Sequence, residues 1–406
     1  MRPSTKGFFV PQRLEEARDA RGVTQGEVAK ALGRSGSSTV SNWERGEQAP
    51  EPATLDQLAR FLEVWPSYLV RPLPAHGHGA IFFRSLASAA KKMRTREKAR
   101  MRWLQHISLA LQTLVDFPDI DFPELVAPGD YLTLSDADLD RLAGEIRRHW
   151  RLGDGPIESM VLVAENAGVV VGVDEVGSTK IDGQGTWSNV DSRPYILLAR
   201  DKNSAYRRQM DAAHELAHLF LHRSISEDEL ARNFDLIEHQ AKFLACALLL
   251  PHRAFASEIP SLSLDGFLTM KRRWRTSVGA MVKRAQDLEI ISDEHASRLW
   301  RYRSTRGWHR QEPYDAPSET PVEEPRLLRR SIELILEHKV RAPRDLVEMD
   351  IGIGAADIEM MTCLTPGSLA AHMRSVVTFE PRLKTLDDPS EEGGGGQVIA
   401  FKPRSQ

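Results

Sequence analysis

Hydrophobic residues recur every three to four positions along most of the chain, which is the spacing of an amphipathic α-helix. This pattern predicts four or five short helices in residues 1–70, a longer helix that begins at Ser135, and another at about 157–167. Three β-rich segments follow, VVVGVDEV, GQGTW and PYILLA, and they predict a small sheet. The fold class expected from the pattern is multidomain and mainly α, with a small β-sheet.

The same pattern divides the chain into five expected parts. These are an all-α domain at residues 1–70, a basic helical connector at 71–128, an α+β domain at 129–260, a basic helical extension at 261–313, and a helical C-terminal region with a Gly-rich tail at 326–406. An acidic, proline-rich break separates the last two parts.

The stretch from Arg207 to His222 contains neither Gly nor Pro and has apolar residues at helical spacing, so we expect a helix that faces the protein interior. Its centre has the sequence H-E-L-A-H, in which His214 and His218 lie one turn apart on the same face. Two imidazoles in this arrangement can share one zinc ion. Glu215 is then placed to act as the acid–base group beside the metal.

Zinc needs a third protein ligand, and the next predicted helix supplies a candidate. From Leu236 the chain has the sequence LIEHQAKFLACALLLP, a helical run that ends at Pro251. Glu238 lies on the largely apolar face of this run, where a carboxylate is costly unless it is paired or bound to a metal. Glu238 is therefore the expected third ligand.

Other side chains on these two helices compete for a role at the site. His222 continues the i, i+4 series of the histidines and remains an alternative ligand. His239 follows Glu238 directly and points about 100° away from it around the helix. Asp211 or Asp235 would suit a carboxylate that orients a ligating imidazole.

The N-terminal pattern is a helix, a Gly-containing turn and a short polar helix, which is typical of a helix-turn-helix. Thr24 and Glu27 are expected to form a capping box, and Val40 and Trp43 are expected in the small core. Short polar side chains are the candidates for contacts with DNA bases or phosphates. They are Gln25, Ser37, Ser38, Thr39, Ser41 and Asn42. A helix-turn-helix that binds protein, or only dimerises, is the alternative.

Two further stretches are basic. The connector carries a cationic run between Arg84 and Arg102 that only Glu97 interrupts. Such a run can hold DNA phosphates, or it can be a solvated helix face. The extension at 261–313 is also cationic. It could contact nucleic acid or cover the preceding domain, and we favour the second interpretation.

The composition is ordinary for a soluble globular protein, with 406 residues, 41% hydrophobic and 27% charged. The net charge is only −3, so DNA binding would depend on local patches. Cys246 and Cys363 lie far apart in apolar surroundings and are expected to be buried thiols. Because no run approaches about 18 apolar residues and the N-terminus lacks a signal-peptide pattern, we expect a cytoplasmic protein without a membrane partner.

Around His214 and Glu238 the sequence resembles the ImmA/IrrE family of zinc metallopeptidases, which carry H-E-L-x-H followed by E-x-x-A-N-x-F-A-x-x-L-L-M-P. The resemblance covers roughly residues 140–310 and implies a zincin-like domain with one Zn²⁺ per chain. By this resemblance, His214, His218 and Glu238 would be the zinc ligands and Glu215 the catalytic acid–base. In zinc peptidases of this plan an edge strand pairs with the substrate; PYILLA is a candidate, although it could equally be an inner strand.

The sequence departs from that family pattern at three positions, where Lys242, Leu244 and Leu250 replace Asn, Phe and Met. The first change removes an amide next to the expected site, and the other two conserve volume. The N-terminal segment resembles the Xre/Cro-repressor DNA-binding domain through T-Q-x-E-V-A, S-x-W-E-R-G and P-x-x-x-L-x-x-L-A. Its turn is about one residue longer than is usual in that family.

Together the two resemblances imply a zinc-dependent endopeptidase and transcriptional regulator of the kind that acts in stress responses or mobile-element control. Its substrate would be a specific regulatory protein, an Xre-type repressor, and the helix-turn-helix would bind double-stranded DNA or that target. A second class stays open, a DNA-binding regulator whose metal site is structural or sensory and not proteolytic. A homodimer is compatible with either class.

Overall fold

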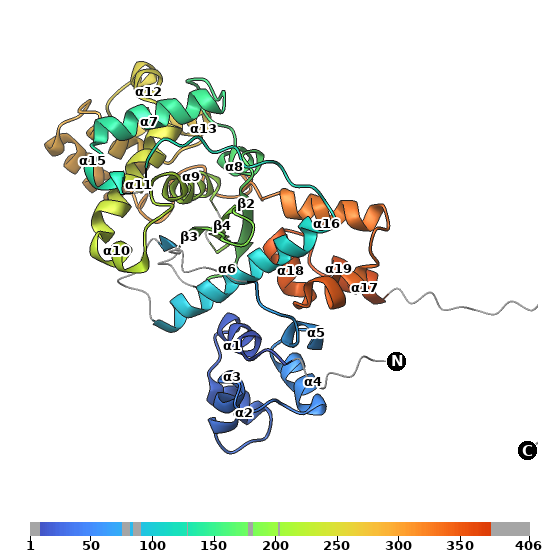
Figure 1. Ribbon diagram of the computed structural model, residues 1–406. Helices are drawn as coiled ribbons and strands as arrows, with labels where there is room; N and C mark the ends of the chain where they lie inside the picture. Colours follow the sequence, from blue (N-terminus) through green and yellow to red (C-terminus); the bar gives the residue numbers. More distant parts are fainter. Residues whose placement is uncertain are drawn as a thin grey trace, which may run out of the picture.

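The computed structural model describes residues 9–74, 82–83, 91–127, 129–177, 182–201 and 204–374. In these ranges the chain is mainly helical, with one 4-stranded sheet near the middle of the molecule (Figure 1). This confirms the multidomain, mainly α fold class with a small β-sheet. No helix in the described ranges is long and apolar enough to cross a membrane. Arg84 and the Gly-rich tail lie outside the described residues.

Short helices form the N-terminal region, as the hydrophobic pattern predicts. They are α1 (Pro11–Ala20), α2 (Gln25–Ala31), α3 (Ser38–Glu44), α4 (Pro52–Phe61) and α5 (Pro66–Leu69). The predicted capping box starts α2, because Thr24 Oγ1 accepts a hydrogen bond from the Glu27 N–H at 3.2 Å and Glu27 Oε2 accepts one from the Thr24 N–H at 2.6 Å. Val40 and Trp43 are buried, as expected.

The sheet has the strand order β1-β3-β4-β2. Its strands are β1 (Phe82–Phe83), β2 (Val170–Asp174), β3 (Gly183–Trp187) and β4 (Pro194–Ala199). β4 pairs in parallel with β2 and antiparallel with β3, and the other edge of β3 pairs antiparallel with β1. The segment PYILLA is therefore an inner strand, β4. The connector strand β1 was not predicted, because two residues are too few to show an alternating pattern.

Successive residues of β4 enter two different hydrophobic cores. Ile196 and Leu198 belong to one core, whereas Tyr195 and Leu197 belong to the other. Because neighbouring side chains of a strand point to opposite faces of the sheet, the sheet itself separates the two cores.

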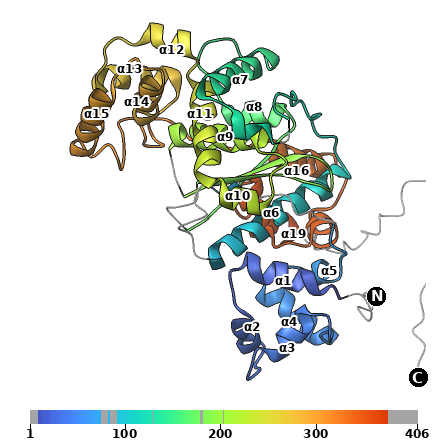
Figure 2. The ribbon, with the colours of Figure 1, turned by 60° about the vertical axis from the view of Figure 1, so that its left-hand side comes forward.

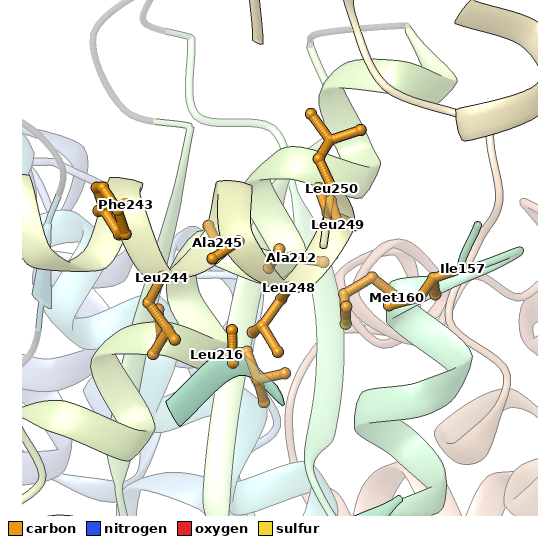
Figure 3. Close-up of a cluster of buried hydrophobic side chains, with 14 of the residues drawn as sticks. Ile157, Met160, Ala212, Leu216, Phe243, Leu244, Ala245, Leu248, Leu249 and Leu250 are labelled. Carbon is orange, nitrogen blue, oxygen red and sulfur yellow. The ribbon is translucent and has the colours of Figure 1, made fainter. Parts of the chain in front are cut away.

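The first core lies between the sheet and the helices that follow it in sequence. They are α9 (Ala205–Leu221), α11 (Phe234–Leu249), α13 (Leu264–Trp274), α14 (Val278–Asp287) and α15 (Asp293–Thr305). Two helices that precede the sheet, α7 (Asp136–His149) and α8 (Met160–Asn166), also contribute to this core. Figure 3 shows Leu244 and Leu248 of α11 pointing toward Leu216 of α9. Trp274 is fully buried here, so the basic extension packs on this core. Shorter elements beside it are η1 (Asp130–Thr133), α10 (Glu227–Arg232) and α12 (His252–Glu258).

The second core combines segments that are far apart in sequence. The connector helix α6 (Lys91–Gln112) lies between the sheet and the N-terminal helices (Figure 2). The C-terminal elements that join it are α16 (Leu327–Glu337), α17 (Pro343–Asp345), η2 (Leu346–Ile351), α18 (Ala355–Thr362) and α19 (Ser368–Arg374). Leu14, Leu104 and Ile332 from the three segments share this core. The five domain boundaries stay predictions, but three of the expected parts are packed together.

The acidic stretch between α15 and α16 is part of the packed structure. Glu312 is only 3% exposed and accepts hydrogen bonds from the N–H groups of Val278 at 2.8 Å and Gly279 at 3.0 Å, at the start of α14. It also pairs with Lys271 at 3.0 Å and Arg303 at 3.1 Å. A carboxylate at a helix N-terminus is favourable because it meets unpaired N–H groups and the positive end of the helix dipole.

Candidate metal centre

The two histidines of the H-E-x-x-H stretch lie side by side on α9. This helix begins after Ser204, whose hydroxyl accepts a hydrogen bond from the Arg207 N–H at 3.4 Å. His214 and His218 are each 1% exposed, and their Nε2 atoms are 3.1 Å apart. The helical spacing thus brings two ring nitrogens to one point inside the protein.

Glu238 comes to the same point from α11, the helix packed against α9. Its Oε1 atom lies 3.7 Å from Nε2 of His214 and 3.4 Å from Nε2 of His218, and the residue is 4% exposed. Among the described residues, these three form the group whose donor atoms, within 4.8 Å of one another, can hold a metal ion. Two imidazole nitrogens and one carboxylate oxygen match the donor set of a catalytic zinc site, so the residues present fit that metal.

The charge on Glu238 is balanced on both sides. Burial by itself would raise the pKa of this carboxyl, but hydrogen bonds from His214 and His218 hold the pKa well below its usual value. Its second oxygen, Oε2, lies 3.3 Å from Nζ of Lys242 one turn later. Lys242, which departs from the family pattern, therefore supplies a positive charge where the family has an amide.

Glu215 lies against β3 on the sheet side of α9 and is 1% exposed. A Cβ atom added to Gly183 would lie 3.2 Å from Oε1 of Glu215, and one added to Gly185 would lie 3.2 Å from Oε2. Both distances are tighter than ordinary van der Waals contact. The G-x-G sequence of β3 thus makes room for the carboxylate, a role that the sequence analysis did not assign.

The remaining candidates on the two helices have other environments. His222 is fully buried, and its Nδ1 lies 3.1 Å from Nδ1 of His218, on the side away from the metal group. Burial, followed by the neighbouring His218, lowers the pKa of His222 to about 3. His239 is exposed and contacts Asp136 at 2.7 Å. Asp235 is exposed, whereas Asp211 is buried on α9. The group in contact with Nδ1 of His218 is His222, and an orienting role for Asp211 or Asp235 stays a prediction.

A cavity of about 770 Å³ opens next to Lys242, the cation that contacts Glu238. Met210 and Asp211 of α9 line it, together with Lys242 and Phe243 of α11. Trp300 and Trp308 from the C-terminal side complete an aromatic and cationic wall. The basic extension and the loop after α15 thus shape the space next to the site.

The candidate DNA-contacting residues gather on α2 and α3, at the end of the molecule away from the sheet (Figures 1 and 2). Ser37 and Ser38 are exposed, and Thr39, Ser41 and Asn42 are partly exposed. Arg45 donates hydrogen bonds to Ser41 Oγ at 2.5 Å and to Asn42 Oδ1 at 2.6 Å. The amide of Gln25 donates to Glu44 at 2.6 Å, so it is already engaged inside the domain.

Several cations of the connector are used within the protein. Arg100 is 3% exposed and pairs with Asp174 at 2.7 Å and with Asp357 at 2.5 Å. Arg96 pairs with Glu97, and Lys98 with Glu227. Arg100 therefore joins α6 to the sheet and to the C-terminal helices, and Lys98 joins α6 to α10.

Two family models match the chain. The model described as helix-turn-helix matches residues 14–69, and a peptidase-family model described as the IrrE N-terminal-like domain matches residues 164–286. The second match contains α9, β3 and the three residues of the metal group. No curated protein matches the chain. The chain is therefore a fusion of an N-terminal Xre-type helix-turn-helix domain with an IrrE-like peptidase domain, as the two resemblances implied.

Proposed function

We propose that this protein is a zinc-dependent endopeptidase and regulator that cleaves a specific regulatory protein. The observation that carries the proposal is the buried convergence of His214, His218 and Glu238 beside Glu215, inside the IrrE-like domain. A purely structural metal site would not need a carboxylate such as Glu215 held next to the metal ligands and close to a cavity.

The residues of the site would have separate roles in the proposed hydrolysis. Zinc held by His214, His218 and Glu238 would supply Lewis acidity that polarises a peptide carbonyl and makes water a nucleophile near neutral pH. Glu215 would take a proton from the attacking water at its carboxylate and deliver it to the leaving amide nitrogen. The close backbone of Gly183 and Gly185 fixes where that carboxylate lies.

The substrate is proposed to be an extended segment of an Xre-type repressor. β3 is the strand that contacts Glu215, but β1 and β4 pair with its two edges, so the peptide would not add to it as a further strand. An extended peptide that passes the metal group would reach the neighbouring cavity. Trp300, Trp308 and Phe243 offer apolar surface there, and Lys242 offers a positive charge, so an aromatic or acidic side chain next to the cleaved bond would be favoured.

The helix-turn-helix is proposed to bind double-stranded DNA through α3. Ser38, Ser41 and Asn42 are short polar side chains on the helix that corresponds to the recognition helix of this motif. Because the domain shares a core with α6 and the C-terminal helices, it would hold the peptidase domain in a fixed orientation on DNA. DNA binding would in this way bring the site to a repressor bound nearby.

Glu215→Gln tests the proteolytic function. Cells that express the wild-type chain or this variant would be compared by labelling of newly formed protein N-termini, and the zinc content of both purified proteins would be measured. We expect new N-termini only with the wild type, a loss of roughly 10²- to 10⁴-fold in cleavage, and one zinc per chain in both proteins.

The alternative function is a DNA-binding regulator with a structural or sensory metal site. It predicts that Glu215→Gln changes neither the set of protein N-termini nor the transcripts that the protein controls. That result, with zinc retained, would exclude hydrolysis and leave regulation as the function.

A further inference from the structure

A buried chain of polar groups extends from the metal group to the backbone of η1. Nδ1 of His218 lies 3.1 Å from Nδ1 of His222, and Nε2 of His222 lies 3.1 Å from Oε1 of Gln240. Nε2 of Gln240 donates a hydrogen bond to the carbonyl oxygen of Tyr131 at 2.6 Å. All four residues are at most 1% exposed, so bulk water does not compete for these contacts.

The last contact fixes the direction of the hydrogen bond between His222 and Gln240. A backbone carbonyl only accepts, so the amide group of Gln240 that faces Tyr131 is the NH₂ group. Its oxygen therefore faces His222, and Nε2 of His222 must carry a proton to donate to that oxygen.

The facing Nδ1 atoms of His218 and His222 lie at hydrogen-bond distance, so one of them is protonated and the other accepts. Because Nε2 of His218 needs its lone pair to bind zinc, Nδ1 of His218 would be the protonated nitrogen and Nδ1 of His222 the acceptor. The remaining nitrogen of His218, Nε2, keeps its lone pair and faces Nε2 of His214 and Oε1 of Glu238.

We propose that His222 is a positioning residue that holds His218 in the tautomer required of a zinc ligand. The proposal rests on the proposed zinc site and assigns His222 no bond to the metal. The role is one that carboxylates or backbone carbonyls often have beside zinc-bound histidines, and here a neutral imidazole performs it through Gln240 and the Tyr131 carbonyl.

The surroundings of the chain protect this arrangement. The rings of Tyr131 and His222 lie nearly perpendicular to each other, with centroids 5.5 Å apart. Ile225, Leu230 and Ile237 pack with Tyr131 in a separate hydrophobic cluster. The segment before α7 and the short helix α10 thus seal the chain of hydrogen bonds from solvent.

The tautomers can be measured directly in the wild-type protein. Long-range ¹H–¹⁵N correlation spectra of the imidazoles, recorded on the full chain with and without Zn²⁺, distinguish an Nδ1–H from an Nε2–H ring. We expect His222 as the Nε2–H tautomer in both states and His218 as the Nδ1–H tautomer with zinc bound, with signals assigned from His222→Asn and His218→Asn. An Nδ1–H or doubly protonated His222 would overturn the proposal.

Zinc affinity gives the second readout, by competition with a chromophoric chelator. His222→Leu removes the acceptor and should weaken zinc binding by roughly 10- to 100-fold at unchanged stoichiometry. His222→Asn keeps an acceptor near the position of Nδ1 and should recover most of the affinity. His239→Asn is the matched control, because His239 is an exposed imidazole on α11 that contacts Asp136 and the ring of Phe243.

The outcomes separate this proposal from the proposed function. A wild-type protein that binds no zinc would refute the proposed function itself. A wild type that binds zinc, with equal affinity in His222→Leu, would refute only the positioning role. If His222→Leu fails to fold, Gln240→Met takes its place, because it frees the His222 tautomer without removing the imidazole; unchanged zinc affinity in that folded variant would likewise refute the proposal.

Discussion

The two helices that carry the candidate functional residues, α9 and α3, place their polar side chains in opposite environments. On α9 the polar side chains His214, Glu215 and His218 are each 1% exposed and are held by contacts from α11 and β3. On α3 the polar side chains are at the surface, where Arg45 is their main partner. Bond-breaking chemistry requires fixed distances and little water, whereas a helix that enters a DNA groove must stay exposed.

The two regions are nevertheless parts of one packed structure. Arg21, which follows α1, and Arg100 of α6 both pair with Asp357 of α18, at 2.5 Å each, and Arg100 also pairs with Asp174 at the end of β2. Gln184 of β3 donates a hydrogen bond to the carbonyl oxygen of Glu97 on α6 at 3.0 Å. The strand that makes room for Glu215 is therefore bound to the helix on which the helix-turn-helix rests.

The largest expected effect comes from removing a buried metal ligand. Glu238→Ala should reduce the zinc content from one per chain to near zero, because two imidazoles alone leave the site one protein ligand short. Elemental analysis after dialysis measures the content, and Lys242→Ala, which changes an exposed neighbour of Glu238, should keep its zinc. Full zinc occupancy in Glu238→Ala would show that another residue is the third ligand.

The junction between the two regions should show a pH dependence of stability. Burial, with a smaller contribution from Asp174, raises the pKa of Glu97 from 4.5 to about 7. Because the folded-state pKa is the higher one, the contribution of Glu97 to stability is fully present below about pH 4.5 and is lost as pH rises through about 7.

Replacing this carboxyl by a neutral amide should remove that loss. Relative to the wild type, Glu97→Gln should gain about 3 kcal/mol of stability between pH 4.5 and pH 8, seen as a smaller fall in Tm. Glu337→Gln, an exposed site on α16, serves as control. Parallel Tm curves for Glu97→Gln and wild type would show that Glu97 ionises normally.

A smaller effect is expected from crowding Glu215 without changing its chemistry. Gly185→Ala places a methyl group 3.2 Å from Oε2 of Glu215, so either the carboxylate or β3 must shift. Because small misplacements of a catalytic group are costly, cleavage should fall by roughly 10²-fold while zinc stays bound. Gly155→Ala meets nothing within 4 Å and should retain full cleavage. Equal rates in both variants would mean that β3 does not position the carboxylate.

The smallest effect is expected on the exposed side of the comparison. Asn42→Ala should weaken binding to DNA sites selected from a random duplex library by about 1 to 2 kcal/mol, with little change for unrelated DNA. Gln57→Ala, an exposed amide on α4, should bind both as the wild type does. Equal losses on selected and unrelated DNA would assign Asn42 to phosphate contact instead.

Much of the local structure could be predicted from the sequence because its signals are local. The capping box of Thr24 and Glu27 and the cap at Ser135 begin helices where predicted. The two histidines of the H-E-x-x-H stretch must share a face if the segment is helical, and a buried Glu238 requires a partner. Cys246 and Cys363 are buried thiols that form no disulfide, as their apolar surroundings predicted.

Other features depend on contacts between distant segments and left no local signal. The contact of His218 with His222, whose partner Gln240 belongs to a different helix, was not predicted. Glu312 lies at the end of the expected basic extension, yet it is buried at the start of α14. Neither environment can be inferred from residues nearby in the sequence.

The sequence by itself determined which helices form and which side chains can bind a metal, because helical periodicity, capping and ligand chemistry act within one or two turns. Only the tertiary structure decided that β4 is an inner strand, that β3 lies against Glu215, and that the C-terminal helices share a core with the helix-turn-helix. The physical reason is that strand order and the covering of each sheet face minimise exposed apolar surface over the whole chain, and no single segment carries that information.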